Sequence, residues 1–414
     1  MQTLERIFSE YRHWQDGHPP ETRRRSAAEQ LRELGLPGVR DEQWRYANLR
    51  ALDQVPDFAP AAPAAPSALV PALPEPVPGF ARLIFNNGLA PDDLPRRLPP
   101  GVSVHAPSGQ WYTLLGADER LALLQQLFGA EASVLRVNGA AQLEILYVAQ
   151  GSGASYPALH LELAPGARLE LIERHLGAHE AGGLICPHVR IALGATAELQ
   201  HYRIQNLGTR SVFYDTLSVQ LAESARYRVC QVALGAATAR TSALLRLQGR
   251  AAALEWHGLS AARDQQVSDC RVRCDHVALD TASTALFRGL ASARARVGFD
   301  GDVQVIANAH GAKVRQSLRG LLEGSGSEVN LRPRLTIHTD QIEATHGATT
   351  GQLDEQLLFY LLSRGLDPAT ARALLKSAFL GDALAAIGIA PLRQQIEQSL
   401  VAHLGDLILG GIPT

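Results

Sequence analysis

The stretch Leu161-Glu162-Leu163-Ala164-Pro165-Gly166-Ala167-Arg168-Leu169 joins an alternating strand, a turn of small residues and a second strand. The same arrangement recurs three times along the chain, at 191–199, 219–227 and 245–254. When the copies are set in register on one leucine each, the intervals are 30, 28 and 26 residues, at Leu163, Leu193, Leu221 and Leu247. The fourth copy slips by one residue, which places Leu254 and Trp256 on its apolar face.

A strand–turn–strand repeat of this period, with no helix between the copies, indicates stacked coils. Each coil buries its inward side chains against its neighbours, and small turn residues let the backbone bend at the corners. The pattern therefore predicts a mainly β protein with a right-handed parallel β-helix over residues 131–348. An antiparallel sandwich remains an alternative, because periodicity alone does not distinguish parallel from antiparallel pairing.

Helical patterns flank this core on both sides. Residues 1–50 are predicted to be an N-terminal helical region, because apolar side chains recur at helical spacing from Leu4 to Trp14. Residues 51–130 are predicted to be an Ala/Pro-rich linker and mixed segment, with an extended, mobile part from Val55 to Pro78. Residues 349–414 are predicted to form a C-terminal helical domain, in which Asp367 and Pro368 begin one helix and Pro391 begins another, with a break at Gly381.

Composition limits the classes of function. The chain has 414 residues, is 46% hydrophobic and carries a net charge of −2, which excludes wholesale disorder and gives no footprint for nucleic acid or an anionic membrane. No apolar run is long enough to span a bilayer, and the N-terminus lacks the apolar region of a signal peptide. Four scattered cysteines do not form a secreted disulfide framework. A cytoplasmic protein is therefore expected.

The segment 333–354 carries the most specific motif. An alternating strand with Leu335 and Ile337 is followed by a predicted turn at His346-Gly347 and then by a helix that contains Leu357 and Tyr360. Together with the run 358–366, this segment resembles the C-terminal signature of the SufB/SufD family, the scaffold subunits of the SUF iron–sulfur cluster assembly machinery. The elements at 41–46 and 275–289 also resemble that family, and Gly347 favours the SufD type because SufB-type chains usually carry glutamate there.

The resemblance implies a non-catalytic scaffold that pairs with a SufB-like subunit through its β-helix and docks a SufC-like ATPase through its C-terminal helices. It also leaves open a homodimer when SufB is absent. The residues that it implies for the ATPase contact are Phe359, Tyr360, Leu361, Arg364 and Gly365. An alternative is that Phe359 and Leu361 only cover the end of the β-helix.

His346 is the candidate metal ligand. A neutral imidazole binds iron well, and the glycine that follows is expected to let the ring project from the rim of the β-helix. The resemblance implies a transient iron–sulfur cluster at the SufB interface, with no cofactor held stably by this chain alone. Family members often carry cysteine where this chain has Ala344. The alternative is a loop histidine that caps backbone groups.

Two other groups of possible ligands are more simply explained as structural. Cys270 and Cys274 lie four positions apart on a predicted strand, roughly 13 Å from each other, which is too far for one metal. A second group is expected to lie in a loop and to be incidental, and consists of His175, His179, Cys186 and His188.

Catalytic motifs of phosphate-binding loops, serine hydrolases and dinucleotide enzymes are absent from the sequence. The competing hypothesis is a β-helix carbohydrate-active enzyme, which needs paired carboxylates on one coil face. Asp300 and Asp302 are the one close pair and are expected to lie at a turn.

Overall fold

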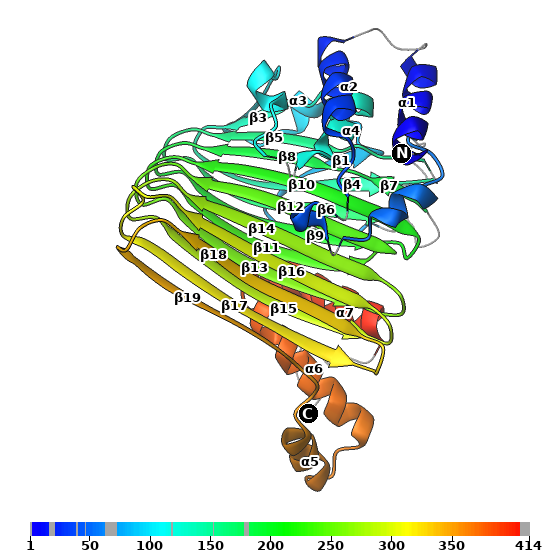
Figure 1. Cartoon of the computed structure of the whole chain (residues 1–414), viewed down its shortest axis with the longest axis vertical. Coiled ribbons are helices and arrows are strands. Elements are labelled where there is room, and N and C mark those ends of the chain that lie inside the picture. Colours follow the sequence, from blue (N-terminus) through cyan, green and yellow to red (C-terminus); the bar gives the residue numbers. More distant parts are fainter. Residues whose placement is uncertain are drawn as a thin grey trace.

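The computed structural model describes residues 2–15, 21–38, 40–45, 47–62, 73–116, 119–151, 153–177 and 182–405 of the chain. Two long sheets face each other across a shared core, and over most of the chain successive strands belong alternately to one sheet and then to the other (Figure 1). The first sheet has the order β1 (Ala81–Asn86), β4 (Ala140–Ala149), β6 (Arg168–Gly177), β9 (Glu198–Leu207), β11 (Arg226–Gly235), β13 (Ala253–Ala262), β15 (Ala282–Ser292), β17 (Ala312–Glu323) and β19 (Ile342–Gly351).

The second sheet supplies the other half of each coil. Its order is β18 (Glu328–Ile337), β16 (Arg296–Val305), β14 (Val267–His276), β12 (Thr238–Leu247), β10 (Ser211–Leu221), β8 (His188–Leu193), β5 (Ala158–Leu163), β3 (Val134–Val137) and β2 (Val102–His105). The short strand β7 (Gly183–Ile185) also pairs with β10. Neighbouring strands are parallel, except that β2 and β3 are antiparallel.

The register confirms the repeat that the sequence predicts. Leu163 lies opposite Leu193, Leu193 opposite Leu221, and Leu221 opposite Leu247. The one-residue slip is also confirmed, because Tyr227 lies opposite Leu254. The fold is therefore a mainly β protein with a parallel β-solenoid and flanking helices, and the antiparallel sandwich is excluded.

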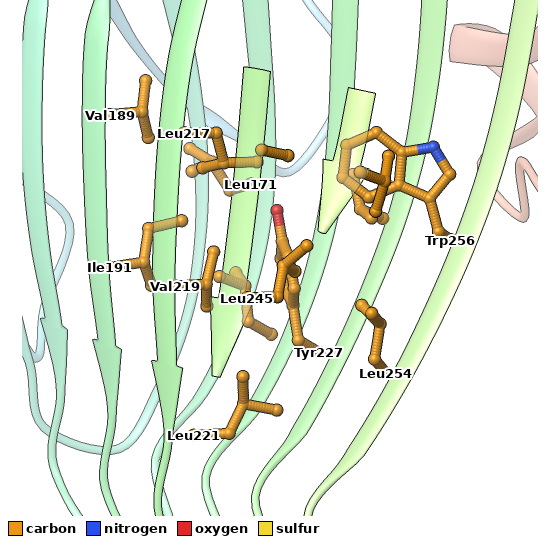
Figure 2. Packing of buried hydrophobic residues seen from close by; sticks show 14 of the residues in the cluster. Leu171, Val189, Ile191, Leu217, Val219, Leu221, Tyr227, Leu245, Leu254 and Trp256 are labelled. Atoms are coloured by element: carbon orange, nitrogen blue, oxygen red, sulfur yellow. The ribbon is translucent and has the colours of Figure 1, made fainter. Parts of the chain in front are cut away.

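The core fills the space between the two sheets. Because side chains alternate along a strand, every second residue points inward and meets the equivalent residue of the next coil. Figure 2 shows this packing for inward side chains from both sheets, all of them buried: Leu171, Val189, Ile191, Leu217, Val219, Leu221, Tyr227, Leu245, Leu254 and Trp256.

The N-terminal helices cover the outer face of the second sheet. Helices α1 (Gln2–Gln15), α2 (Thr22–Leu34) and α4 (Ala122–Phe128) form a second core with side chains of that sheet, including Val212 and Tyr214. The short elements here are η1 (Glu42–Trp44), η2 (Leu49–Gln54), α3 (Leu94–Arg97) and η5 (Gly109–Tyr112).

The prediction of a mobile segment from Val55 to Pro78 is wrong for the part that the structure describes. Val55, Phe58 and Val77 are buried, and Pro60 forms a β-bridge with Ala154. The apolar side chains in this Ala/Pro-rich stretch bind it to the sheets, whereas composition alone indicated a linker. Residues 63–72 lie outside the described part. The segment 51–130 also contributes β1 and β2, so the sheets extend beyond 131–348 on that side.

The C-terminal helices are α5 (Glu355–Ser363), α6 (Pro368–Leu384) and α7 (Ala390–Leu404). Helices α6 and α7 pack on the outer face of the first sheet, where Leu380 and Ile396 join a core with Ile204 and Val232. Asp367 caps α6 by accepting hydrogen bonds from the backbone amides of the second and third helical residues, as predicted. The helix continues through Gly381, where a break was expected, because its buried face runs on to Leu384. None of the helices in the described residues is long and apolar enough to cross a membrane.

Candidate functional site at the open end of the solenoid

The last coil, made of β18 and β19, leaves one end of the solenoid open. Both strands lie at sheet edges, β18 beside β16 and β19 beside β17 (Figure 1). All residues of β19 except Ile342 are exposed. An edge strand carries backbone N–H and C=O groups that can pair with a strand of another chain. This end can therefore accept a further strand on each sheet.

His346 lies in the middle of β19 and not at a turn, which corrects the prediction from the sequence. It is in register with Gln316 of β17. The backbone of Gly347 does not adopt a positive φ, and Gly347 pairs with Ser317 in the β-ladder. The β-branched residues Thr345 and Thr349 on either side favour an extended strand, and they override the turn tendency of the glycine.

The register also places His346 on the inward face of the last coil. Val314 and Leu318 of β17 belong to the core, and side chains of parallel partners project to the same side of a sheet. Their partners Ala344 and Ala348 therefore face inward, and so does His346 between them. Gln316 is buried, and its Nε2 donates to the carbonyl oxygen of Arg334 at 3.4 Å. His346 is exposed because no further coil covers it.

Within the part of the chain that the structure describes, His346 has no neighbouring set of metal ligands. In the described residues, no three His, Cys, Asp or Glu side chains come together in a way that could hold a metal ion. All four cysteines are buried. Burial raises the pKa of Cys230 to about 12 and raises the pKa of Cys186, Cys270 and Cys274 as well, so these thiols stay protonated. A metal at His346 would therefore need ligands from another molecule.

Cys270 and Cys274 point into the solenoid core from β14, with Val272 between them. The neighbouring His276 is also buried, and it holds a corner of the coil together. Its Nδ1 lies 2.8 Å from Thr281 Oγ1 and its Nε2 lies 2.8 Å from Ser283 Oγ. The segment 275–289 therefore contributes to the coils of the solenoid.

The second predicted group does not converge. His175 lies in strand β6 and not in a loop, His188 is packed edge-on against His160, and the Cys186 thiol donates to the carbonyl oxygen of Leu121. His179 lies outside the described residues. The Nε2 of His175 lies 2.7 Å from Glu173 Oε1, in a buried network that the sequence did not reveal.

That network centres on Glu173 inside the solenoid. His201 Nε2 lies 3.0 Å from Glu173, and Arg203 joins Glu173 to Asp215 through hydrogen bonds to both carboxylates. Burial by itself raises the pKa of Glu173, but the Arg203 charge and the two imidazoles hold it well below its usual range. The network joins strands β6, β9 and β10, so only the coil register could have indicated that its residues meet.

A family model described as "SUF system FeS cluster assembly, SufBD core domain" matches residues 146–379. The chain belongs to the SufBD family. It is 26% identical over 406 residues to the iron–sulfur cluster assembly protein SufD of Escherichia coli K12, with 92% of each chain covered. It is 27% identical over 413 residues to a SufBD family protein of Synechocystis, with 91% of this chain and 89% of the relative covered. These relatives support a SufD-type role in iron–sulfur cluster assembly.

Helix α5 projects from the open end of this SufBD protein (Figure 1), and none of its residues is buried. The side chains of Phe359 and Tyr360 are 72% and 54% exposed. Leu361 is half-buried, and the Arg364 guanidinium lies 5.2 Å from the centre of the Tyr360 ring. Gly365 is exposed and ends the helix with a positive φ of 91°. Phe359 therefore does not cover the end of the solenoid and is available to a partner.

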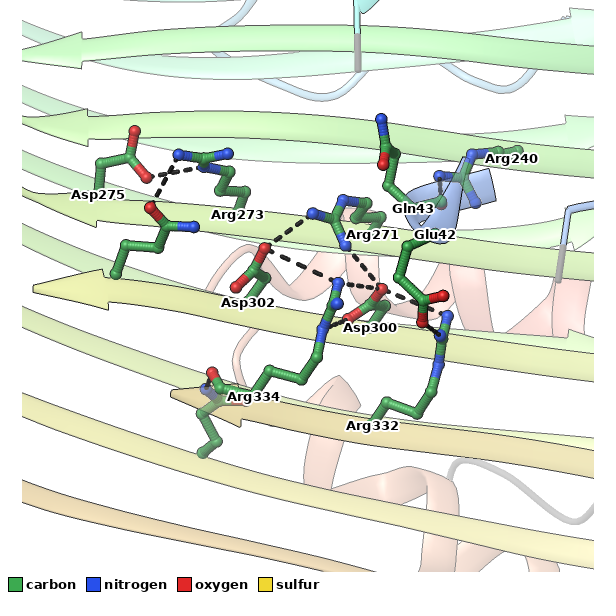
Figure 3. A network of polar contacts seen from close by, with 12 residues as sticks. Glu42, Gln43, Arg240, Arg271, Arg273, Asp275, Asp300, Asp302, Arg332 and Arg334 are labelled. Atoms are coloured by element: carbon green, nitrogen blue, oxygen red, sulfur yellow. Dashed lines mark hydrogen bonds and ion pairs between the residues drawn. The ribbon is translucent and has the colours of Figure 1, made fainter. Parts of the chain in front are cut away.

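Asp300 and Asp302 lie in strand β16 and not at a turn, which corrects the expectation for the carbohydrate-enzyme hypothesis. Both are buried and bound to arginines: Arg271 Nη1 lies 2.7 Å from Asp300, and Arg271 Nη2 lies 2.7 Å from Asp302 (Figure 3). A glycosidase needs carboxylates that face a substrate groove. The only candidate pair from the sequence is part of an ion-pair network, so this hypothesis is not favoured.

Proposed function

We propose that this chain is a SufD-type scaffold subunit without catalytic activity of its own, which pairs with a SufB-like subunit through the open end of the solenoid. The observation that carries the proposal is the last coil. Its strand β19 is exposed along almost its whole length, and β18 beside it is also a sheet edge. Long exposed edge strands are usually blunted or covered in proteins that act alone. A partner that continues both sheets would remove this exposure.

In the same proposal, His346 supplies one ligand to a transient iron–sulfur cluster that forms at the junction. Its ring faces the inside of the last coil, where an added coil from the partner would enclose it. Thiolate ligands would come from the partner, because this chain has Ala344 where the family resemblance often places cysteine, and its four cysteines are buried. The chain alone would therefore hold no stable cluster.

Helix α5 would dock the SufC-like ATPase through Phe359, Tyr360, Leu361, Arg364 and Gly365. Exposed aromatic side chains next to an arginine are frequent anchors at protein interfaces. The proposed setting is cytoplasmic, without nucleic-acid or membrane contacts, and a homodimer through the same open end is the alternative assembly when SufB is absent.

Proline substitution in β19 tests the pairing. Backbone N–H groups of a strand point alternately to its two sides, so one of the variants Ala348→Pro and Thr349→Pro removes a donor on the open side. That variant should keep the wild-type unfolding temperature and yet fail to co-purify with a co-expressed SufB-type subunit. Thr349→Val, which keeps the N–H, should co-purify normally. Wild-type recovery of the complex with both proline variants would overturn the proposed pairing.

A further inference from the structure

Charged side chains on the outer face of the second sheet form columns across the strands. The register aligns Arg271 of β14 with Asp300 of β16 and Arg332 of β18. The next outward position aligns Arg273, Asp302 and Arg334. In both columns the sign of the charge alternates from strand to strand, and both columns end on an arginine at the open edge (Figure 3).

The arginines of the edge strand β18 are held in place by ion pairs with Asp300 of the neighbouring strand β16. Arg334 binds Asp300 through Nε at 3.0 Å and Nη2 at 2.8 Å, and Arg332 Nη2 lies 3.3 Å from the same carboxylate. Asp300 is 1% exposed, whereas the side chains of Arg332 and Arg334 are 22% and 34% exposed. Asp300 thus fixes two guanidinium groups that reach the surface along the edge of β18, and Arg332 Nη1 also lies 4.0 Å from Glu42 Oε1 of η1.

A strand added beside β18 would lie about 4.8 Å away, and its side chains would continue these columns. Opposite charges directly across two strands are favourable, and arginine binds a carboxylate through a planar pair of hydrogen bonds. Pro333 lies between the two arginines and has no N–H to offer, so backbone pairing is weakened at the centre of β18. At this point, recognition of a partner strand therefore depends more on side-chain contacts than on backbone hydrogen bonds.

We propose that the partner strand that pairs with β18 presents two carboxylates, two residues apart, to Arg332 and Arg334. This inference rests on the proposed function, because it assumes that the open end is the pairing surface. The feature that selects the partner at β18 is a pair of acidic side chains on the outer face of the incoming edge strand.

A second copy of this chain does not offer that chemistry. The acidic residues of β18 and β19 are Glu328 and Glu343, one on each strand, so neither strand has carboxylates two residues apart. An antiparallel pairing of two β18 strands centred on Pro333 would set Arg332 of one copy opposite Arg334 of the other. Like charges directly opposite are unfavourable. The two arginines therefore favour a different, acidic partner strand over self-pairing.

The test measures the dissociation constant of the full-length chain and a purified SufB-type subunit of the same organism at low and high salt. The variant is Arg332→Gln with Arg334→Gln, and the control is Arg319→Gln, an exposed arginine of β17 one strand from the other edge. We expect the double variant to bind about tenfold more weakly at low salt. The difference from wild type should shrink in about 1 M salt, which screens exposed charges. The control should bind as wild type does.

Wild-type affinity of the double variant at low salt would overturn the inference. So would an equal loss at both salt concentrations. The proline variants of β19 distinguish a failure of this inference from a failure of the proposed function. If a proline variant loses the complex while the glutamine double variant still forms it, the proposed pairing stands and the acidic-strand inference fails. If glutamine lowers the unfolding temperature, the salt dependence of wild-type binding decides, and an affinity that does not change between 0.1 and about 1 M salt contradicts the inference.

Discussion

Lys376 Nζ lies 3.0 Å from Oε1 and 3.3 Å from Oε2 of Glu323, and this ion pair joins helix α6 to the end of strand β17. The Lys376 side chain is 1% exposed, and that of Glu323 is 35% exposed. Lys376 is one of two lysines in the chain, beside 37 arginines. Its compact ammonium group is buried between helix α6 and the solenoid, next to the coil that carries the open end.

Glu323→Gln should lower the free energy of unfolding by about 2 kcal/mol, because it leaves a buried ammonium group beside a neutral side chain. Urea unfolding at neutral pH measures the change. Glu328→Gln is the matched control, since Glu328 is exposed on β18, and it should change stability by no more than about 0.5 kcal/mol. Equal stability of the two variants would show that the Lys376–Glu323 pair does not anchor α6.

The double variant Phe359→Ala, Tyr360→Ala should keep the wild-type unfolding temperature, because α5 buries none of its residues. It should lose binding to a purified SufC-type ATPase by at least tenfold, as expected when aromatic anchors are removed from an interface. Leu366→Ala, on the half-buried loop after α5, is a suitable comparison outside the proposed contact. Undiminished binding by the double variant would place the ATPase elsewhere.

Acid should destabilise the folded chain through buried histidines. Burial lowers the pKa of His160, His188 and His276 to about 2, 3 and 4. In the unfolded chain a histidine titrates near 6.5, so only the unfolded state takes up protons between pH 6.5 and 4. Stability is therefore complete above about pH 6.5 and falls as the pH drops, by about 2 kcal/mol per histidine at pH 5. His276→Gln should lose about 2 kcal/mol less than wild type between pH 7 and pH 5 in urea unfolding, and an identical loss would contradict this.

The thiols should be unreactive in the folded protein. All four cysteines are buried, and burial raises their pKa. A thiol-selective reagent at pH 7.5 should label none of them in the native state, and all four after denaturation. Cys270→Ser and Cys274→Ser should leave cluster assembly on the complex close to wild type. Rapid labelling of native Cys270 or Cys274, or loss of assembly in either serine variant, would show that a core thiol takes part.

The sequence was sufficient for the solenoid because its coils repeat. One leucine per copy gave the register that the strands adopt, down to the one-residue slip before Leu254. His346 could be singled out from a family motif, but its place in a strand could not, because glycine after histidine is typical of turns and the neighbouring threonines are a weaker signal. The packing of Phe58 into the N-terminal core was equally hidden by the Ala/Pro-rich composition around it.

Ion-pair networks that join different coils could not be predicted from the sequence for a different reason. Asp300 and its arginines, like Glu173 and Arg203, are separated by about one coil or more in sequence and meet only when the coils stack in register. A pair such as Asp300 and Asp302 looks like a catalytic signal until the arginines of neighbouring strands are placed beside it.

The most direct test of the central claim is iron–sulfur cluster assembly on the complex of this chain with its SufB-type and SufC-type partners. His346→Ala removes an exposed imidazole from an edge strand, so stability should change by no more than about 1 kcal/mol and the complex should still form. Iron and sulfide content and cluster absorbance should nevertheless fall steeply, because Ala344 leaves no thiol beside the lost ligand. His338→Ala, an exposed histidine just after β18 at the same open end, should assemble clusters as wild type does. Wild-type cluster content with His346→Ala, in a complex that forms normally, would contradict the role assigned to His346.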